Sequence, residues 1–460
     1  MIDSESLVRD LVETFNLSGF VHDNIPQRDV FLSYLVICFV NHLENGYYAP
    51  LLEQLSDVAD NSDVDQLLDA GFEYKKPSHR FHFTEFFTAI INLNNVEKIT
   101  QMAEKMAFLN ESGTLLNSAA NELTVIYDHV LQRLQTMNAE DRLGKNFNYQ
   151  EPPFDFSELI ALLANRRFSH RAYDPYATTG ESSVSYALHS INASITTESV
   201  MQTAKYINHK LVIAGVSEID TKHSYALSPR ANVEPESFDV AFTLFQPTET
   251  SELAEYEEKK RLNKTFIDNR IIAGTIFDKY REHGFIQHII WSLKQDGIGF
   301  VILGKGPLHR QFESEARNLL LKGNFVDAVI QLPPKLITSR TVPLYILVMK
   351  KNRGDNTKIK FIDASSFCTF DGRCNQLTNI EKLASLYHMD NVDSGMTSLV
   401  DVHDIDPNSA LLTVSGYVKS VDDHHEEIDS DLIRQELARQ QKMTDYLLSK
   451  LNNVTNSEDT

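Results

Sequence analysis

The sequence has few cysteines and no long apolar run, and each shortage excludes a class of protein. Cys38, Cys368 and Cys374 are too few for a disulfide framework, and their spacing fits neither a zinc knuckle nor a redox pair. The best apolar run, Phe31 to Val40, falls short of the roughly 18 residues that cross a bilayer. We therefore expect a soluble protein without membrane spans, whose thiols are free.

A secretory signal is also missing from the start of the chain. Met1 to Asp10 is acidic and polar, whereas a signal needs a basic start followed by an apolar stretch. We therefore expect a cytoplasmic location.

Positive charge is the third shortage. The net charge of -21 argues against a protein that holds nucleic acid through an overall basic field, because phosphates are neutralised by clustered Lys and Arg. Any contact with DNA would have to be local or shared with a basic partner.

The length and the apolar periodicity indicate several domains. A chain of 460 residues with 42% hydrophobic content exceeds what one core organises. Apolar residues recur at helical spacing from Leu7 to about Leu143, until Glu151 to Pro153 interrupts the pattern. We therefore predict an all-helical N-terminal domain over residues 1–148.

Residues 149–365 alternate between helical and strand patterns, which is typical of a doubly wound, mostly parallel α/β sheet. The predicted strands are Arg171 to Tyr173, Ala193 to Ile195, Val240 to Leu244, Gly299 to Leu303, Val326 to Leu332 and Leu344 to Lys350. The predicted helices are Phe156 to Ala164, Ser182 to Ile191, Glu198 to Ala214, Phe285 to Lys294 and Arg310 to Lys322.

The last part of the chain is polar and rich in turns. We expect loops over residues 366–425, within a loop-rich connection that extends to residue 428. Residues 429–460 carry spaced apolar side chains on a polar background, which predicts an amphipathic helix that packs on a partner or on the protein itself.

Ligands of an open parallel sheet bind beyond the carboxyl ends of its strands, so the first turn of the sheet is informative. It reads Asp-Pro-Tyr-Ala-Thr-Thr-Gly-Glu over Asp174 to Glu181, and a second motif, Leu-Phe-Gln-Pro, follows the strand that ends at Leu244. Further stretches appear in order, from Phe285 to Leu303, from Val326 to Pro334 and from Pro343 to Ser365. Together they resemble the methyltransferase subunits of type I restriction-modification systems, of the N6-adenine class, over nearly the whole chain.

The resemblance implies a site for S-adenosylmethionine at the first turn. In the family, glycines there let the backbone approach the donor, but Thr178 and Glu181 stand at two of the glycine positions and Gly180 alone remains. The family also presents an acidic residue after the second strand, and Ser194 is expected at that place. The donor-binding residues that the resemblance implies are Asp174, Pro175, Thr179, Gly180, Ser194 and Asp239.

The second motif corresponds to the family's catalytic Asn-Pro-Pro-Phe or Asn-Pro-Pro-Tyr. In the family its polar side chain accepts a hydrogen bond from the adenine amino group, and its aromatic ring stacks on the flipped base. Here the motif is degenerate, because Leu244, Phe245, Gln246 and Pro247 occupy its positions. Leucine accepts no hydrogen bond, so we expect impaired transfer unless Gln246 or Thr243 has taken over the role.

Two functions from different classes remain open at this point. One is a catalytically impaired subunit of a restriction-modification or phage-defence assembly, which holds a specificity or nuclease subunit. The other is an active DNA N6-adenine methyltransferase with an atypical site. A third, weaker hypothesis is another nucleotide or metabolite in the crevice. Contact with DNA within a complex is expected, and a homo-oligomer stays open.

A metal site is not expected. The acidic and histidine-rich run from Asp422 to Glu427 consists of adjacent residues in a polar stretch, which do not converge on one ion. A solvated loop explains this run better.

Overall fold

The computed structural model of the chain describes residues 4–17, 20, 25–56, 96–110, 114–115, 118–136, 154–165, 169–177, 180–199, 204–227, 232–244, 282–336, 341–370, 375–389 and 395–418.

The N-terminal part is helical, as predicted. Its core is centred on α2, which is apolar on every side and therefore buried all round, with Leu35, Val36 and Ile37 fully enclosed. Phe15 packs edge to face against Phe31 in the same core. The helices are α1 (Ser4–Leu17), α2 (Ile25–Leu43), α3 (Ala49–Ser56), α6 (Val96–Met106), the 3-10 turn η1 (Ala107–Asn110) and α7 (Ala120–Thr136).

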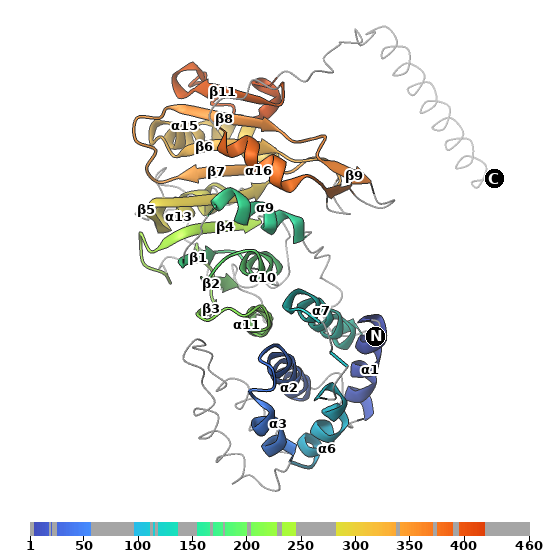
Figure 1. Cartoon of the computed structure of the whole chain (residues 1–460). Coiled ribbons are helices and arrows are strands. Elements are labelled where there is room, and N and C mark those ends of the chain that lie inside the picture. Colours follow the sequence, from blue (N-terminus) through green and yellow to red (C-terminus); the bar gives the residue numbers. More distant parts are fainter. Residues whose placement is uncertain are drawn as a thin grey trace, which may run out of the picture.

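A nine-stranded sheet in the order β11-β8-β6-β7-β5-β4-β1-β2-β3 forms the rest of the described chain (Figure 1). The strands β3, β2, β1, β4 and β5 are neighbours in that order, and each runs parallel to the next. Strand β7 is antiparallel to both of its neighbours, β5 and β6, and β11 is antiparallel to β8. The predicted doubly wound, mostly parallel sheet is confirmed. The strands are β1 (His170–Asp174), β2 (Ala193–Ser199), β3 (Ile219–His223), β4 (Phe238–Leu244), β5 (Leu293–Leu303), β6 (Val326–Gln331), β7 (Tyr345–Lys350), β8 (Lys358–Asp363) and β11 (Thr397–Asp401).

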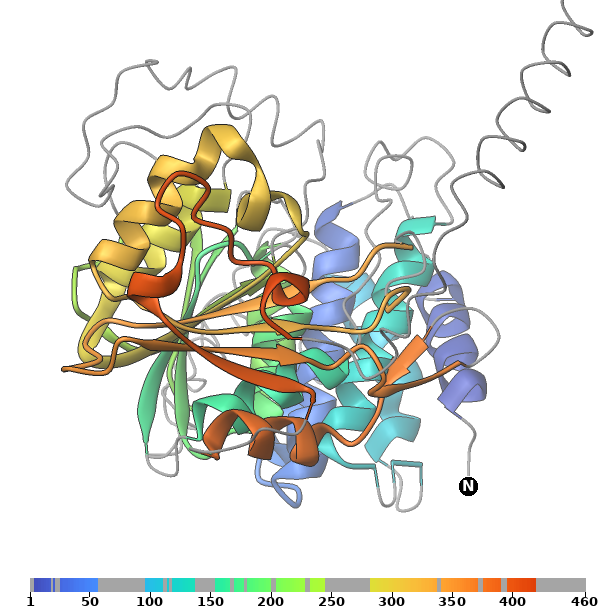
Figure 2. The same cartoon turned by 90° about the horizontal axis from the view of Figure 1, so that it is seen from above.

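Helices cover both faces of the sheet (Figure 2). Successive side chains of a strand point to opposite faces, so Phe300 and Ile302 of β5 join one apolar cluster and Val301 and Leu303 join the other. The first face carries α9 (Phe154–Ala164), α10 (Glu181–Leu188), α11 (Ala204–Ile213) and α16 (Ile380–His388). The second face carries α13 (Glu282–Ser292), α14 (Gly306–His309), η2 (Gln311–Glu313), α15 (Ser314–Lys322), η3 (Val402–Asp404) and η4 (Val414–Gly416).

Helix α11 joins the helical part to the sheet. Tyr206, Val212 and Ile213 belong to the core of the N-terminal helices, whereas Ile207 and Leu211 of the same helix belong to the core of the sheet. The N-terminal helices therefore lie beside the β3 edge of the sheet, where Figure 1 shows α2 and α7 next to α11.

Several local predictions are wrong. Residue Glu198 was expected to begin a helix, but β2 continues through it to Ser199, and α11 begins only at Ala204. Strand β3 was missed, because Ile219–His223 is mostly polar and lies at the edge of the sheet. Strand β7, the last of the predicted strands in sequence, lies between β5 and β6 in the sheet.

The described residues within 366–425 are not only the loops that the sequence predicts. They include a hairpin of β9 (Cys368–Phe370) and β10 (Asn375–Leu377), together with α16 and β11. The helix predicted over residues 429–460 lies outside the described residues. The domain boundaries proposed at residues 148, 365 and 428 stay predictions.

Candidate functional site

The order of the strands reverses at β1. From β1 the chain continues outward to β2 and β3 and then returns to place β4 on the other side of β1. Such a reversal leaves a crevice beyond the carboxyl ends of the two central strands, where doubly wound sheets bind their ligands. Asp174 ends β1 and Leu244 ends β4, so these two residues mark the candidate site.

Asp174 is a buried carboxyl group with few hydrogen-bond donors. It accepts hydrogen bonds from the backbone N–H of Tyr176 at 3.1 Å and from the hydroxyl of Ser183 at 3.0 Å. Burial raises the pKa of Asp174 to about 7, because these donors compensate only part of the lost hydration. Perturbed carboxyl groups of this kind gather at functional sites. Pro175, which follows, is also buried.

Gly180 ends the same turn in a left-handed conformation, with φ of 87°. A Cβ atom at this position would lie 2.8 Å from Cγ2 and 2.9 Å from Cγ1 of Ile207 on α11. Glycine is therefore required here both by the backbone conformation and by the packing of α11 against the turn.

We expect Gly180→Ala to lower the free energy of unfolding by about 2 to 3 kcal/mol, from left-handed backbone strain and overpacking together. Chemical denaturation would measure the loss. Gly180→Ala should cost less in an Ile207→Ala background, which lacks both Cγ atoms, because only the backbone strain then remains. An equal Gly180→Ala loss in both backgrounds would contradict the role assigned to Ile207.

Glu181 is paired within the protein and does not place a bare charge in the crevice. Its Oε1 atom lies 2.6 Å from Nζ of Lys210 on α11. The same ammonium lies 2.9 Å from Oδ1 of Asp128 on α7. The residue at a family glycine position thus belongs to a buried ion cluster that reaches the N-terminal helices.

The acidic residue at the carboxyl end of the second strand is Glu198, which our sequence reasoning missed. Its side chain is fully buried, and its carboxylate accepts hydrogen bonds from the hydroxyl of Tyr173 at 2.5 Å, the hydroxyl of Ser224 at 2.7 Å and the amide of Asn232 at 2.9 Å. Thr196 lies opposite Tyr173 in the parallel register, so Glu198, two residues further on, shares the face of Tyr173. Extending the predicted strand through Thr196 and Thr197 would have located it.

Two of the expected donor-binding residues lie at the other end of the sheet. Ser194 is the second residue of β2 and Asp239 is the second residue of β4. Asp239 accepts a hydrogen bond from the backbone N–H of Arg171 at 2.8 Å and pairs with Lys294 at 2.9 Å. The structure therefore brings together Asp174, Gly180 and Glu198, but not Ser194 or Asp239.

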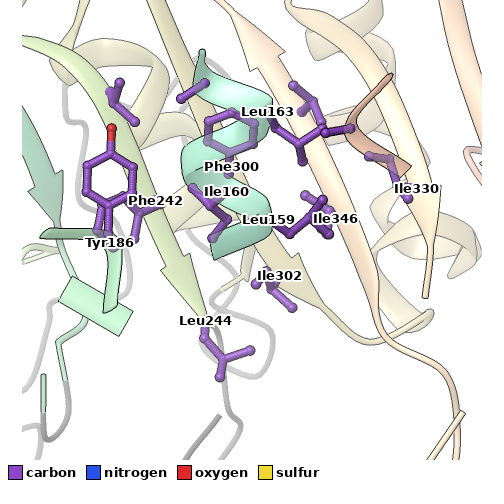
Figure 3. Close-up of a cluster of buried hydrophobic side chains, with 14 of the residues drawn as sticks. Leu159, Ile160, Leu163, Tyr186, Phe242, Leu244, Phe300, Ile302, Ile330 and Ile346 are labelled. Atoms are coloured by element: carbon purple, nitrogen blue, oxygen red, sulfur yellow. The ribbon is translucent and has the colours of Figure 1, made fainter. Parts of the chain in front are cut away.

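Leu244 ends β4, at the position that the resemblance assigns to the hydrogen-bond acceptor. Its side chain is buried in the apolar cluster of the first face, with Phe242 and Ile302 (Figure 3). Thr243, the alternative acceptor, is fully enclosed. The other motif residues, Phe245, Gln246 and Pro247, and Thr179 of the turn, lie outside the described residues.

Within the described residues, no group of three or more His, Cys, Asp or Glu residues could hold a metal ion. None of the helices placed there has both the length and the apolar character to span a membrane.

Comparisons with known proteins agree with this architecture. The methylase subunit of the type I restriction enzyme MpnII from Mycoplasma pneumoniae is 33% identical over 161 residues, which cover 34% of this chain and 30% of that subunit. The methylase subunit of MjaVII from Methanocaldococcus jannaschii is 30% identical over 193 residues, 40% of this chain and 32% of that subunit. The chain therefore matches about a third of the length of these relatives.

A solved structure shows the same fold. The methyltransferase subunit of a type I restriction-modification system from Streptococcus thermophilus superposes with a TM-score of 0.59 at 16% identity, over 90% of this chain and 100% of that one. The family model described as N-6 DNA methylase matches residues 118–426, well over half of the sequence. The chain belongs to the N-6 DNA methylase family.

Proposed function

We propose that this chain is a methyltransferase-like subunit of a DNA restriction-modification or phage-defence assembly, and that it keeps the methylase fold for assembly but has lost methyl transfer. The observation that carries the proposal is Leu244 at the carboxyl end of β4. The family's reaction needs a hydrogen-bond acceptor for the adenine amino group at this place.

An apolar side chain here acts against the reaction in two ways. It offers no oxygen to the amino group, and it removes the partner that would compensate the adenine for its lost hydration. Leu244 packs with Phe242 and Ile302 in the core. Its side chain therefore fills the space that another hydrogen-bond acceptor would need.

The fit of S-adenosylmethionine can be tested on the described residues of the turn. Both oxygens of Glu198 already accept hydrogen bonds, from Tyr173 on one side and from Ser224 and Asn232 on the other. A ribose hydroxyl would have access only to the remaining lone pair of Oε1, on a carboxylate that is fully buried. In this arrangement the protein's own donors and the burial of the carboxylate leave Glu198 poorly placed to hold S-adenosylmethionine.

A nucleotide in the same crevice is disfavoured by charge. Phosphates bind at helix N-termini, where free N–H groups and the helix dipole attract anions. Glu181, the first residue of α10, is paired with Lys210, but the carboxylate of Glu198 near the end of β2 carries a negative charge that opposes a phosphate.

The assembly role is inferred from the relatives, which are named as methylase subunits of type I restriction enzymes. For this chain we infer a protein partner of the specificity or nuclease kind and contact with DNA within the complex. The net charge of -21 is consistent with DNA contact that the partner shares.

The test combines donor binding with methyl transfer. We expect no saturable heat with S-adenosylmethionine up to millimolar concentration, and no label from a radioactive donor in duplex DNA above the protein-free reaction. Both are measured on the purified chain and on the complex recovered with its partners, with folding checked by circular dichroism. Saturable heat at micromolar donor together with N6-methyladenine in the DNA would establish the active methyltransferase instead.

A further inference from the structure

Lys210 lies between two parts of the molecule that are distant in sequence. Its ammonium group is almost completely buried and pairs with Glu181 at 2.6 Å and with Asp128 at 2.9 Å. Glu181 begins α10 directly after the turn that follows β1, whereas Asp128 lies on α7 among the N-terminal helices. One side chain of α11 therefore contacts both units at once.

The charges make each of these contacts depend on the other. Burial alone would lower the pKa of Lys210, but the two carboxylates outweigh it and hold the pKa above its ordinary value. Asp128 and Glu181 are also buried, so neither is screened by water as a surface pair would be. The cluster holds two carboxylates and one ammonium group, so loss of Lys210 would leave two buried carboxylates without that cation, and loss of either carboxylate would leave Lys210 with a single anionic anchor.

We propose that Asp128, Lys210 and Glu181 form a clamp that couples the docking of the N-terminal helices to the conformation of the turn after β1. When α7 is docked, Asp128 holds Lys210 in the position where it also holds Glu181. When α7 moves away, Lys210 loses one of its two anchors and gains access to water, and the first turn of α10 loosens. A partner that displaces the helices would thereby change the crevice without touching it. The inference does not depend on whether the chain transfers methyl groups.

Two further contacts join α11 to the N-terminal helices, a boundary that we call the seam, and neither includes α10. The hydroxyl of Tyr206 donates to Asp29 at 2.7 Å, and the hydroxyl of Tyr127 lies 2.6 Å from Nδ1 of His209. Both join α11 to the N-terminal helices. They make it possible to separate the clamp from the general packing of the seam.

The experiment is amide hydrogen exchange on the full chain, read separately in α7 and in residues 184–188 of α10. Asp128→Asn keeps the shape of the side chain and removes its charge, and we expect exchange in α10 to accelerate on the order of tenfold. Because coupling between two sites is reciprocal, Glu181→Gln should accelerate exchange in α7 by a similar factor. Tyr206→Phe is the matched control, which should affect α2 and leave α10 unchanged.

The clamp would be overturned if each isosteric variant accelerates exchange only in its own helix. It would equally be overturned if Tyr206→Phe accelerates α10 as much as Asp128→Asn does, because the effect would then come from the seam as a whole. Thermal unfolding of each variant shows that the chains compared are folded. Binding of S-adenosylmethionine or DNA enters none of these measurements, so their outcome is independent of the proposed function.

Discussion

Replacing Arg317 by methionine is expected to lower the free energy of unfolding by about 3 to 5 kcal/mol, the loss typical of a broken buried charged network. The guanidinium is fully buried on α15. It donates four hydrogen bonds of 2.7 to 3.0 Å to the backbone carbonyls of Pro307, Arg310, Ser409 and Ala410. Methionine fills a similar volume and donates none of them, so those carbonyls lose their partners.

Chemical denaturation followed by the fluorescence of Trp291, the one tryptophan of the chain, would measure this loss in the part that contains α13. Arg9→Met is the matched control, because the side chain of Arg9 is 74% exposed and its contacts, with Asp10 and with the hydroxyl of Ser6, lie at the surface. A loss below about 1 kcal/mol for Arg317→Met would show that water takes over the four carbonyls.

Replacing Asp174 by asparagine should stabilise the protein at pH 8. Burial raises the pKa of Asp174 from 3.8 to about 7, so the folded protein binds this proton more tightly than the unfolded chain. The resulting stabilisation is complete below about pH 4 and is lost as the pH rises to about 7. The difference between the pKa values of the unfolded and folded states corresponds to about 4 kcal/mol as an upper limit. Asparagine is neutral at every pH and can still accept from Tyr176 and bond to Ser183.

The measurement is the difference in unfolding free energy between Asp174→Asn and the unmodified protein, followed from pH 4 to pH 8. The unfolding free energy of the variant should exceed that of the unmodified protein by an amount that increases up to about pH 7 and then stays constant. His283 also titrates anomalously, because burial lowers its pKa to about 4. It is present in both proteins and cancels in the difference. A difference that does not change with pH would show that Asp174 is ionised in the folded protein throughout this range.

The architecture was predictable because the strands of the central sheet are short apolar runs. Val326–Gln331 and Tyr345–Lys350, for example, are buried on both faces and are bounded by turns. Edge strands carry less of this signal. The polar β3 was missed for that reason, and β11 was taken for a loop.

The site was predictable only where sequence neighbours determine it. Asp174 and Gly180 lie on one turn, and their position followed from the end of the first strand. Glu198 depends on how far β2 continues, and the polar residues Thr196 and Thr197 hid that extension. The pairing of Glu181 with Lys210 depends on tertiary packing, which no local pattern records.

This packing also changes how variants of the turn should be used. A bulky residue at Gly180 would fill the turn after β1, but its Cβ atom would first meet Ile207 inside the protein. Loss of binding in such a variant would report damage to the fold as readily as loss of a ligand contact. Glu198→Gln causes less steric damage, because it keeps the volume at the end of β2 and changes the charge and one of the two acceptor oxygens.

The strand order divides the sheet at one place, between β4 and β5. Strands β1 to β4 lie on one side of the β4–β5 pair, and every strand from β5 onward that belongs to this sheet lies on the other. Each half is therefore built from one uninterrupted stretch of chain, and the stretch between Leu244 and Glu282 is the covalent link from β4 to α13 and β5. A gene divided within that stretch would encode two fragments, each with its own complete set of adjacent strands. The sheet is in this sense composed of two halves, each contiguous in sequence, which pair along β4 and β5.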